Sequence, residues 1–375
     1  MITDPVTKTF LENNSRYLSK RMSSITGRLF IMLSPRLRKI YRDYSDEKQT
    51  ELKACACANL LDAIEENAVW RAKLLTMYAR KAIRVFRNQK GYRGRSIDYS
   101  DRKAKDYYSV AVMVRNEARY IKEFILFYKA TGADRIYIYD NDSTDDLLEV
   151  IRPFLETGFV VYRYLHGQKV HTLAYRDAIR RAKKRTKWLA LIDADEFLFS
   201  PKGSMPEQLK AYKKYPGVGV NWVVFGPSGH ETRREGLIMD NYTETYADTN
   251  TMMNRHIKSI VQPSKVFSVP NPHFAIYNNG DYAVDETGDV IDNYCAYAEG
   301  VGRAFTRNNH RDVFRINHYY TKSIEDMNEK RKRGSADGSR REAYEIALKS
   351  FDAPMTKDLT IKPYADIVRK EYYTY

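Results

Sequence analysis

The stretch that decides the fold is Trp188-Leu-Ala-Leu-Ile-Asp-Ala-Asp-Glu-Phe-Leu-Phe199, in which an apolar run ends in Asp193, Asp195 and Glu196. Such a run is typical of a buried strand whose carboxyl end lies at the edge of a sheet. Carboxylates there cost free energy unless a cation pairs with them, and Mg²⁺ or Mn²⁺ suits them best. In extended backbone Asp193 and Asp195 would share one face, and Glu196 would point the other way, toward a basic residue. The stretch predicts a divalent-metal site, with a solvated acidic turn as the alternative.

The composition predicts a large protein with anionic partners. At 375 residues and 43% hydrophobic content, we expect one large domain with an appendage, or two domains. The chain has 63 Lys and Arg against 48 Asp and Glu, a net charge of +15. This charge favours nucleotide phosphates, nucleic acid or an anionic membrane as partners.

The cysteines and apolar segments predict a cytoplasmic location. Cys55, Cys57 and Cys295 have neither the number of a disulfide framework nor the usual zinc spacing, which favours a reducing compartment. No apolar run approaches the ~20 residues of a membrane span. Residues 1–11 lack the apolar centre of a signal peptide. We expect a cytoplasmic protein, with peripheral contact at the inner face of the cell membrane as a further prediction.

Residues 1–105 are predicted to form a basic α-helical region. Leu74, Tyr78, Ala82 and Val85 recur at helical spacing, and Lys and Arg fill the remaining faces. Two interpretations stay open. The helices either lie on an anionic membrane surface or pack on the main domain with a solvated basic face.

The next part of the chain alternates between strand and helix patterns. We expect strands at 108–114, 135–139, 159–164 and 189–192, and helices at 118–131, 147–155 and 171–187. This order predicts an α/β fold with a mostly parallel central sheet, in which ligands bind outside the carboxyl ends of the strands. A further strand is expected at 217–225.

The polar residues that follow these strands suit a nucleoside diphosphate. Asp, Glu and Asn side chains match ribose hydroxyls and base edges, the Asp193–Asp195 pair matches a metal-bound diphosphate, and lysines offset the charge of a leaving group. The candidates are Arg115, Asn116, Glu117, Asp140, Asn141, Asp142, Lys169, Asp193, Asp195 and Lys322.

Taken in order, these motifs resemble those of the GT-A glycosyltransferases, most closely family 92 and its family-2-like bacterial relatives of the capsule or surface-polysaccharide type. The resemblance is carried by Val114-Arg-Asn-Glu117, Tyr139-Asp-Asn-Asp-Ser-Thr-Asp145, the stretch from Trp188 to Phe197, and residues 222–230, 258–263 and 317–323. It covers about residues 107–335. It implies a GT-A domain at 106–335, between the basic helical region 1–105 and a helical C-terminal tail at 336–375.

The resemblance also implies roles for single residues. Arg115, Asn116, Glu117, Asp140, Asn141, Asp142, Lys169 and Asp193 would bind the nucleotide, and Asp193, Asp195 and His318 would hold Mn²⁺ or Mg²⁺, with His273 as the second choice of histidine. Family 92 enzymes invert the donor's anomeric configuration, which requires a general base; Glu231 and Asp240 are the candidates. The donor implied is a UDP-sugar, and the acceptor a glycan or glycolipid.

Three other functions fit parts of the pattern. The charge and the 30 tyrosines would suit a nucleic-acid-binding protein, but the basic residues form no recognisable module. A nucleotidyltransferase could use the same aspartate pair, yet Arg115-Asn-Glu117 stands where such enzymes carry a Gly-rich loop, and no Gly-x-x-x-x-Gly-Lys motif is present. A scaffold without activity would have no need of Asp193 and Asp195.

Replacement of Asp195 tests the metal assignment. We expect Asp195→Ala to abolish sugar transfer while the fold stays intact, because the carboxylate binds the ion and does not pack the core. The measurement is transfer from a nucleotide-sugar, with circular dichroism to check the fold. A variant that transfers sugar at the normal rate would show that the metal site lies elsewhere.

Overall fold

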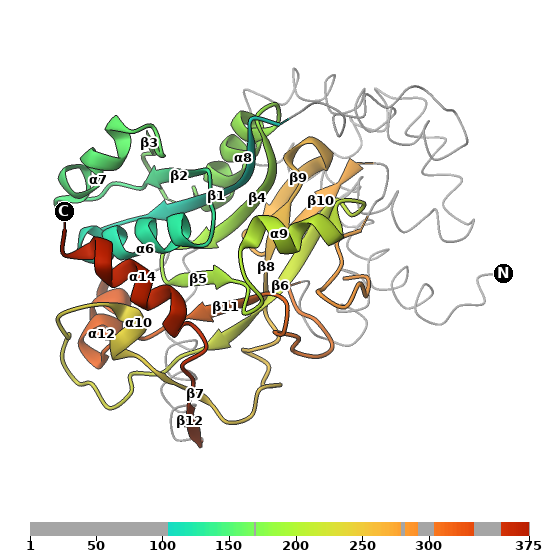
Figure 1. Cartoon of the computed structure of the whole chain (residues 1–375). Helices are drawn as coiled ribbons and strands as arrows, with labels where there is room; N and C mark the ends of the chain where they lie inside the picture. The colour runs from blue at the N-terminus through green and yellow to red at the C-terminus, as the bar shows by residue number, and fades with distance from the viewer. Residues whose placement is uncertain (1–103, 169, 279–281, 292–303, 334–353, 375) are drawn as a thin grey trace, which may run out of the picture. The chain divides into compact units, whose positions relative to one another are not determined.

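A computed structural model describes the chain apart from residues 1–103, 169, 279–281, 292–303, 334–353 and 375 (Figure 1). The described residues belong almost entirely to one compact unit. The predicted basic helical region 1–105 therefore lies outside the described residues except at its last two positions. Every helix of the described part is too short or too polar to span a bilayer.

The structure confirms the alternation of strands and helices. The strands are β1 (Asp106–Val114), β2 (Arg135–Asp140), β3 (Val160–Tyr164), β4 (Thr186–Asp193), β5 (Glu196–Phe199), β6 (Gly217–Val224), β7 (Glu244–Tyr246), β8 (Ile257–Val261), β9 (Val266–Asn271), β10 (Phe274–Tyr277), β11 (Arg315–His318) and β12 (Met355–Lys357). The helices are α6 (Ala118–Ala130), α7 (Leu147–Glu156), α8 (His171–Ala182), α9 (Met205–Leu209), α10 (Ile238–Asn241), α12 (Ile324–Arg333) and α14 (Lys362–Tyr372), with 3₁₀ turns at Lys210–Tyr212 and Pro263–Lys265.

The central sheet has the strand order β3-β2-β1-β4-β8-β6-β11-β5. Strands β3, β2, β1 and β4 pair in parallel, and β11 pairs in parallel with β6. The pairings of β4 with β8, β8 with β6 and β11 with β5 are antiparallel. The predicted α/β fold with a mostly parallel central sheet is confirmed.

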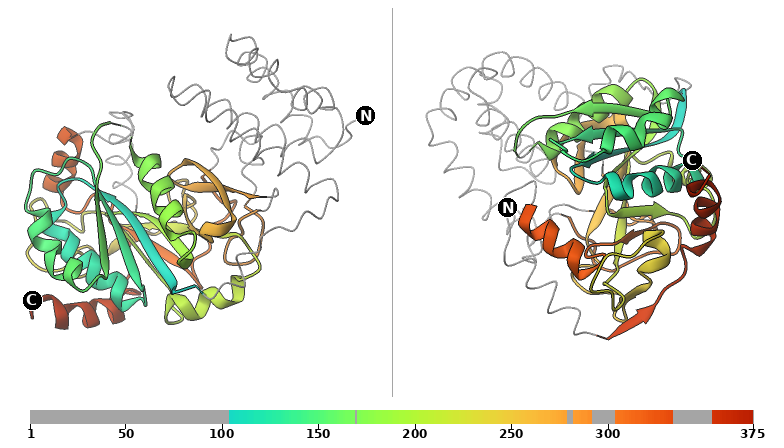
Figure 2. Two further views of the ribbon diagram at one scale, coloured as in Figure 1. Left: turned by 90° about the horizontal axis from the view of Figure 1, so that it is seen from above. Right: turned by 90° about the vertical axis from the view of Figure 1, so that its left-hand side faces the viewer.

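Helices cover both faces of the parallel part of the sheet. Side chains at alternate positions of β1 and β4, including Val110, Val112 and Ile192, pack in the core with α6. The positions between them, including Ala111 and Leu191, are buried as well but lie outside that core. Figure 2 shows α6 and α7 on one side of these strands and α8 on the other. Burial on both faces explains why β4 is apolar without alternation.

One predicted boundary differs in the structure, and another is not tested by it. Residues 186 and 187, predicted to end a helix, belong to β4 instead, because Thr186 pairs with Asp106 of β1 and the helix ends at Ala182. The separate tail at 336–375 stays a prediction. Its described part contains β12, which pairs with β7, and α14, which packs against α6.

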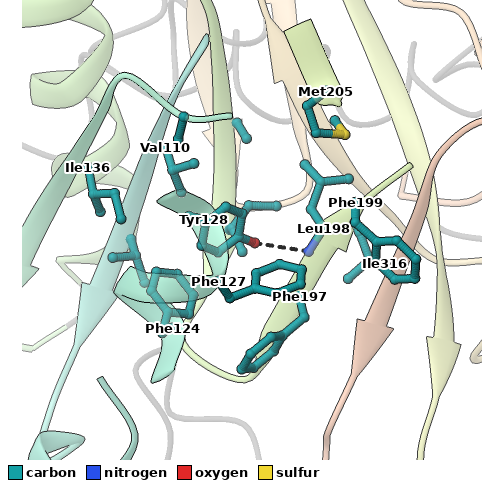
Figure 3. Packing of buried hydrophobic residues seen from close by; sticks show 14 of the residues in the cluster. Val110, Phe124, Phe127, Tyr128, Ile136, Phe197, Leu198, Phe199, Met205 and Ile316 are labelled. Atoms are coloured by element: carbon teal, nitrogen blue, oxygen red, sulfur yellow. Dashed lines mark hydrogen bonds between the residues drawn. The ribbon is translucent and has the colours of Figure 1, made fainter. Parts of the chain in front are cut away.

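An aromatic cluster joins α6 to β5. Phe127 lies 4.9 Å from Phe197 and 5.2 Å from Tyr128 between ring centroids. The buried Tyr128 hydroxyl donates to the carbonyl of Glu196 at 2.9 Å. It also accepts from the amide of Leu198 at 3.1 Å, the bond drawn in Figure 3. This phenol therefore completes the backbone hydrogen bonds of β5 just after the acidic turn.

The sheet topology places the carboxyl ends of β4 and β11 at the same edge of the sheet. Strand β6 is antiparallel to β8, which is antiparallel to β4, so β6 and its parallel neighbour β11 run in the direction of β4. Strand β11 ends at His318, which is paired with Glu196, the first residue of β5. The carboxyl ends of β4 and β11 thus meet at one edge of the sheet.

Removal of the Tyr128 hydroxyl should destabilise the domain. Tyr128→Phe would leave the buried Glu196 carbonyl and Leu198 amide without this partner, and we expect a loss of about 1–3 kcal/mol in the free energy of unfolding. Urea denaturation measures it. Tyr373→Phe, at a side chain 70% exposed, is the control and should change stability little. Equal stabilities of the two variants would contradict this role of Tyr128.

Candidate functional site

The acidic turn between β4 and β5 is closed by Glu196. The Glu196 Oε2 atom accepts the amide N–H of Asp193 at 2.9 Å, and its side chain is fully buried. Its Oε2 lies 3.8 Å from the Lys258 ammonium, so the predicted contact with a basic residue is present. Glu196 does not point away from Asp193 as predicted, because both carboxylates lie against the same ammonium. Burial raises the pKa of Glu196 well above its usual value despite the nearby lysine.

Asp193 is held by groups inside the protein. Its Oδ1 lies 2.9 Å from the Lys258 ammonium, 3.1 Å from His171 Nε2 and 3.0 Å from the Tyr175 hydroxyl. Burial would raise the pKa of Asp193, but Lys258 and His171 outweigh this effect and hold that pKa well below its usual value. The Lys258 side chain is completely buried. Asp193 and Lys258 therefore form an internal ion pair beneath the strand end.

Asp195 has a different set of partners. Its Oδ1 lies 3.5 Å from His318 Nε2, and its Oδ2 accepts from the Lys330 ammonium of α12 at 2.5 Å. The backbone carbonyl of Asp195 accepts the amide of Tyr319 at 2.9 Å, which fixes the turn against β11. Burial works against ionisation of Asp195, but Lys330 and His318 hold its pKa well below the usual value. Burial lowers the pKa of His318.

The two aspartates do not share a face as the sequence predicts. That expectation assumed extended backbone through Asp195, whereas the chain turns at residues 194–195. Asp193 consequently faces Lys258 and Asp195 faces His318 and Lys330. Within the described residues, no three His, Cys, Asp or Glu side chains form a group that could hold a metal ion by themselves.

The loops after β1 and β2 are tied together by Asn116. Its side-chain Oδ1 accepts the backbone N–H of Thr144 at 2.7 Å, and its backbone N–H donates to the Ser143 hydroxyl at 3.0 Å. Asn116 and Asp142 have φ values of 55° and 57°, in the left-handed region that few non-glycine residues adopt. Strained backbone of this kind clusters at ligand-binding sites.

The polar residues that end β2 are held by tyrosines and backbone groups. Asp140 is buried and accepts from the Tyr162 hydroxyl at 2.7 Å, and Asp142 accepts from the Tyr164 hydroxyl at 2.6 Å. Hydrogen bonds from Tyr164, His166 and the amide of Gly167 lower the pKa of Asp142 to about 2. The Asn141 side chain donates to the carbonyls of Leu165 and Gly167.

Other predicted residues lie around this edge. The Glu117 carboxylate is 3.8 Å from the Lys322 ammonium, which also lies 4.5 Å from the centre of the Tyr120 ring. Lys322 has a φ of 53°, so a third site position has left-handed backbone. Arg115 is exposed. Lys169 lies outside the described residues.

The two candidate bases have different surroundings. Asp240, on α10, forms an ion pair of 2.5 Å with Arg369 of α14. Glu231 is exposed, and its backbone carbonyl accepts the amide of Glu325 in the first turn of α12 at 3.0 Å. Glu231 is thus next to the helix that carries Lys330, whereas Asp240 is tied to the C-terminal helix.

His273, the second choice of metal ligand, packs in a buried cluster. Its Nδ1 lies 3.0 Å from the carbonyl of Ile257, and its ring is 5.4 Å from that of Trp222 between centroids. His318 packs against the same indole at 4.3 Å. Burial lowers the pKa of His273 to about 3. Of the two histidines, only His318 has a contact with the acidic turn in the structure described here.

Four residues of this site are not predicted individually from the sequence: Lys258, His171, Tyr175 and Lys330. Lys258 could have been found, because a lysine in a short strand with Ile257, Ile260 and Val261 costs free energy unless a carboxylate pairs with it. Lys330 lies in the basic run Lys330–Arg333, where no local pattern distinguishes it.

Comparison with known sequences identifies the domain. Residues 107–333 match the model of glycosyltransferase family 92. A family 92 protein of Oryza sativa subsp. japonica is 30% identical over 200 residues, which cover 50% of this chain and 33% of that protein. One of Ricinus communis is 27% identical over 198 residues, 50% of this chain and 35% of that protein. The match therefore spans about a third of these relatives' length. They are plant proteins and do not support the bacterial capsule type.

Solved structures show weaker likeness. Staphylococcus aureus TarS 1–349 in complex with UDP has a TM-score of 0.30 and 14% identity, covering 42% of this chain and 47% of that one. The mannosyltransferase PcManGT from Pyrobaculum calidifontis, in complex with GDP-Man and Mn²⁺, has a TM-score of 0.23 and 19% identity, covering 45% and 47%. Scores this low give no information about the site or the substrate of this chain.

The ion pair beneath the turn gives a stability prediction. Lys258→Met would leave the half-buried Asp193 carboxylate without its main cation, and we expect the free energy of unfolding to fall by up to about 3 kcal/mol at pH 7. The depressed pKa of Asp193 stabilises the wild type above the unfolded value of about 3.9, and that stabilisation is lost as the pH falls through the lower folded value.

The difference between the two proteins should therefore narrow as the pH falls to about 4 and below. Denaturant titrations over this pH range measure it. Lys202→Met, at an exposed lysine, is the matched control and should follow the wild type. A deficit in Lys258→Met that is independent of pH would contradict the pairing with Asp193.

Proposed function

Because this chain belongs to glycosyltransferase family 92, we propose that it moves a sugar from a UDP-sugar to a glycan or glycolipid acceptor with the help of Mn²⁺ or Mg²⁺ and with inversion at the anomeric carbon. The observation that carries the proposal is the Asp195 carboxylate 3.5 Å from His318 at the carboxyl edge of the sheet. In open α/β sheets this edge is where ligands bind.

The donor groups fit a hard divalent ion that a substrate helps to hold. Asp195 offers a carboxylate and His318 an imidazole whose Nε2 atom faces that carboxylate at 3.5 Å. Mg²⁺ is commonly bound by one or two carboxylates, with the remaining positions taken by waters and substrate phosphates. Asp195 and His318 would hold the ion, which as a Lewis acid would offset charge on the departing diphosphate. Asp193 would stay paired with Lys258 and would not ligate the ion directly.

The loops after β1 and β2 would bind the nucleoside. Asn116 and Asp142 have strained backbone at the same edge of the sheet, and Asp140 is the last residue of β2. Carboxylate and amide groups suit ribose hydroxyls and the edge of uracil. The Arg115 side chain is exposed beside them and would add positive charge near the phosphates.

A general base would remove the proton from the acceptor hydroxyl as its oxygen attacks the anomeric carbon and the diphosphate leaves. We favour Glu231 over Asp240 for this role. Glu231 lies next to α12, which reaches the acidic turn through Lys330, whereas the Asp240 carboxylate is paired with Arg369.

The location and the wider role are proposals as well. We propose a cytoplasmic enzyme that builds a polysaccharide close to the inner face of the membrane, supported by the net charge of +15 and the basic N-terminal sequence.

Ligand-dependent stabilisation tests the donor and the metal together. We expect UDP with Mn²⁺ to raise the melting temperature, by the equivalent of about 2.7 kcal/mol at a hundred times the dissociation constant, while either alone has a smaller effect. Thermal shift with UDP, GDP and CDP, each with and without Mn²⁺, also identifies the nucleotide.

Asp195→Asn and His318→Ala should each lose the Mn²⁺-dependent part of this stabilisation, and Lys202→Met should keep it. A screen of nucleotide-sugars for metal-dependent hydrolysis then identifies the sugar. Stabilisation by DNA without any response to the nucleotides would favour the nucleic-acid-binding alternative and reject the proposal.

A further inference from the structure

Lys330 has an unusual position for a lysine in a basic run. Its ammonium donates to Asp195 Oδ2 at 2.5 Å and to the carbonyl of Tyr320 at 3.3 Å, and it lies 4.6 Å from the centre of the Tyr320 ring. It therefore occupies one oxygen of the carboxylate that the proposed function assigns to the metal. The other oxygen of Asp195 faces His318.

The two lysines of the acidic turn differ in their access to solvent. The Lys258 side chain is 0% exposed and its ammonium lies against both Asp193 and Glu196. The Lys330 side chain is 29% exposed and reaches Asp195 from the surface of α12. A lysine has a long flexible stem with a compact charge at its end. Lys330 can move its charge into solvent or onto a ligand, whereas Lys258 cannot leave without exposing a buried ion pair.

The backbone of α12 is fixed on the domain, so this movement requires only the side chain. Asp326 accepts from the Tyr120 hydroxyl at 2.7 Å, from Arg233 Nε at 2.7 Å and from the Ser323 hydroxyl at 2.6 Å. These bonds join the first turn of α12 to α6 and to the loop that contains Arg233. Lys330 stands one turn further along the same helix.

The charges at Asp195 make the lysine and a divalent ion competitors. Asp195 is already neutralised by the Lys330 ammonium, and a second cation on the same carboxylate repels the first. The diphosphate of a donor brings negative charge to this edge of the sheet and offers the ammonium a new partner. Lysine binds phosphate as a point charge and needs no fixed orientation.

Resting on the proposed function, we propose that Lys330 is a diphosphate-binding residue that exchanges partners. Before the donor arrives it occupies Asp195, and it moves to the donor's diphosphate when a divalent ion takes its place on that carboxylate. The lysine thereby keeps Asp195 paired in the empty enzyme and adds one positive charge to the leaving group in the loaded one.

The exchange predicts two opposite changes in a single variant. In Lys330→Met, Mn²⁺ should bind the nucleotide-free protein about tenfold more tightly, because no internal cation competes. At saturating Mn²⁺, UDP should bind about tenfold more weakly, because its diphosphate loses a positive partner. UMP, which has no diphosphate, should bind as it does to the wild type. Electron paramagnetic resonance of free Mn²⁺ and calorimetry with UDP and UMP measure these affinities in the full chain.

Matched variants separate this role from general effects of charge. Lys332→Met removes an exposed lysine of the same helix and should leave all three affinities unchanged. Lys330→Arg keeps the charge and should preserve the preference for UDP over UMP. Melting temperatures of all variants show that each is folded.

The outcomes are distinct. If the wild type binds Mn²⁺ and UDP but Lys330→Met matches it in both affinities, the role of Lys330 is rejected and the proposed function stands. Weaker UDP binding without tighter Mn²⁺ binding rejects the exchange. If the wild type binds neither Mn²⁺ nor any of UDP, GDP and CDP, the proposed function and the role of Lys330 both fall.

Discussion

The site depends on the burial of one positive charge, the Lys258 ammonium, between Asp193 and Glu196. Three ionisable groups that would each be costly alone become tolerable together. Their contacts hold the end of β4 against β8 while the Glu196 carboxylate closes the turn onto the Asp193 amide. The chain can then start β5 at once and pair it with β11. This pairing brings His318 to the acidic turn.

Tyrosine hydroxyls hold several carboxylates of the domain in position. Carboxylates accept hydrogen bonds from phenols in the pairs Tyr120–Asp326, Tyr139–Asp177, Tyr162–Asp140, Tyr164–Asp142 and Tyr175–Asp193. A phenol satisfies a carboxylate without adding positive charge and keeps its proton at neutral pH. The phenols thus help to fix these acids in position. Several of the 30 tyrosines, which as a composition would suit a nucleic-acid-binding protein, therefore have this structural role.

The structure gives the two aspartates of the turn different tasks. Asp193 is neutralised from inside by Lys258, which cannot be exchanged without breaking the fold, whereas Asp195 is paired with Lys330, which reaches solvent. Strained backbone at Asn116, Asp142 and Lys322 lies at the ends of the segments that meet here. Strained backbone and paired charges at one edge of a sheet are features of ligand-binding sites.

The sequence by itself determined the order of strands and helices from β1 to β4, because burial on both faces of a parallel sheet leaves apolar runs that are visible in the sequence, and it placed polar clusters at the ends of these strands. Through a family resemblance, it also assigned His318 and Asp195 to one metal site. The tertiary structure alone decided which charges pair. Lys258 and Lys330 lie 63 and 135 residues beyond Asp195, and only the sheet order and the packing of α12 bring them to the turn. The failure of the shared-face prediction has the same origin, since the turn at residues 194–195 is set by buried Glu196 and Lys258, contacts that no local period encodes.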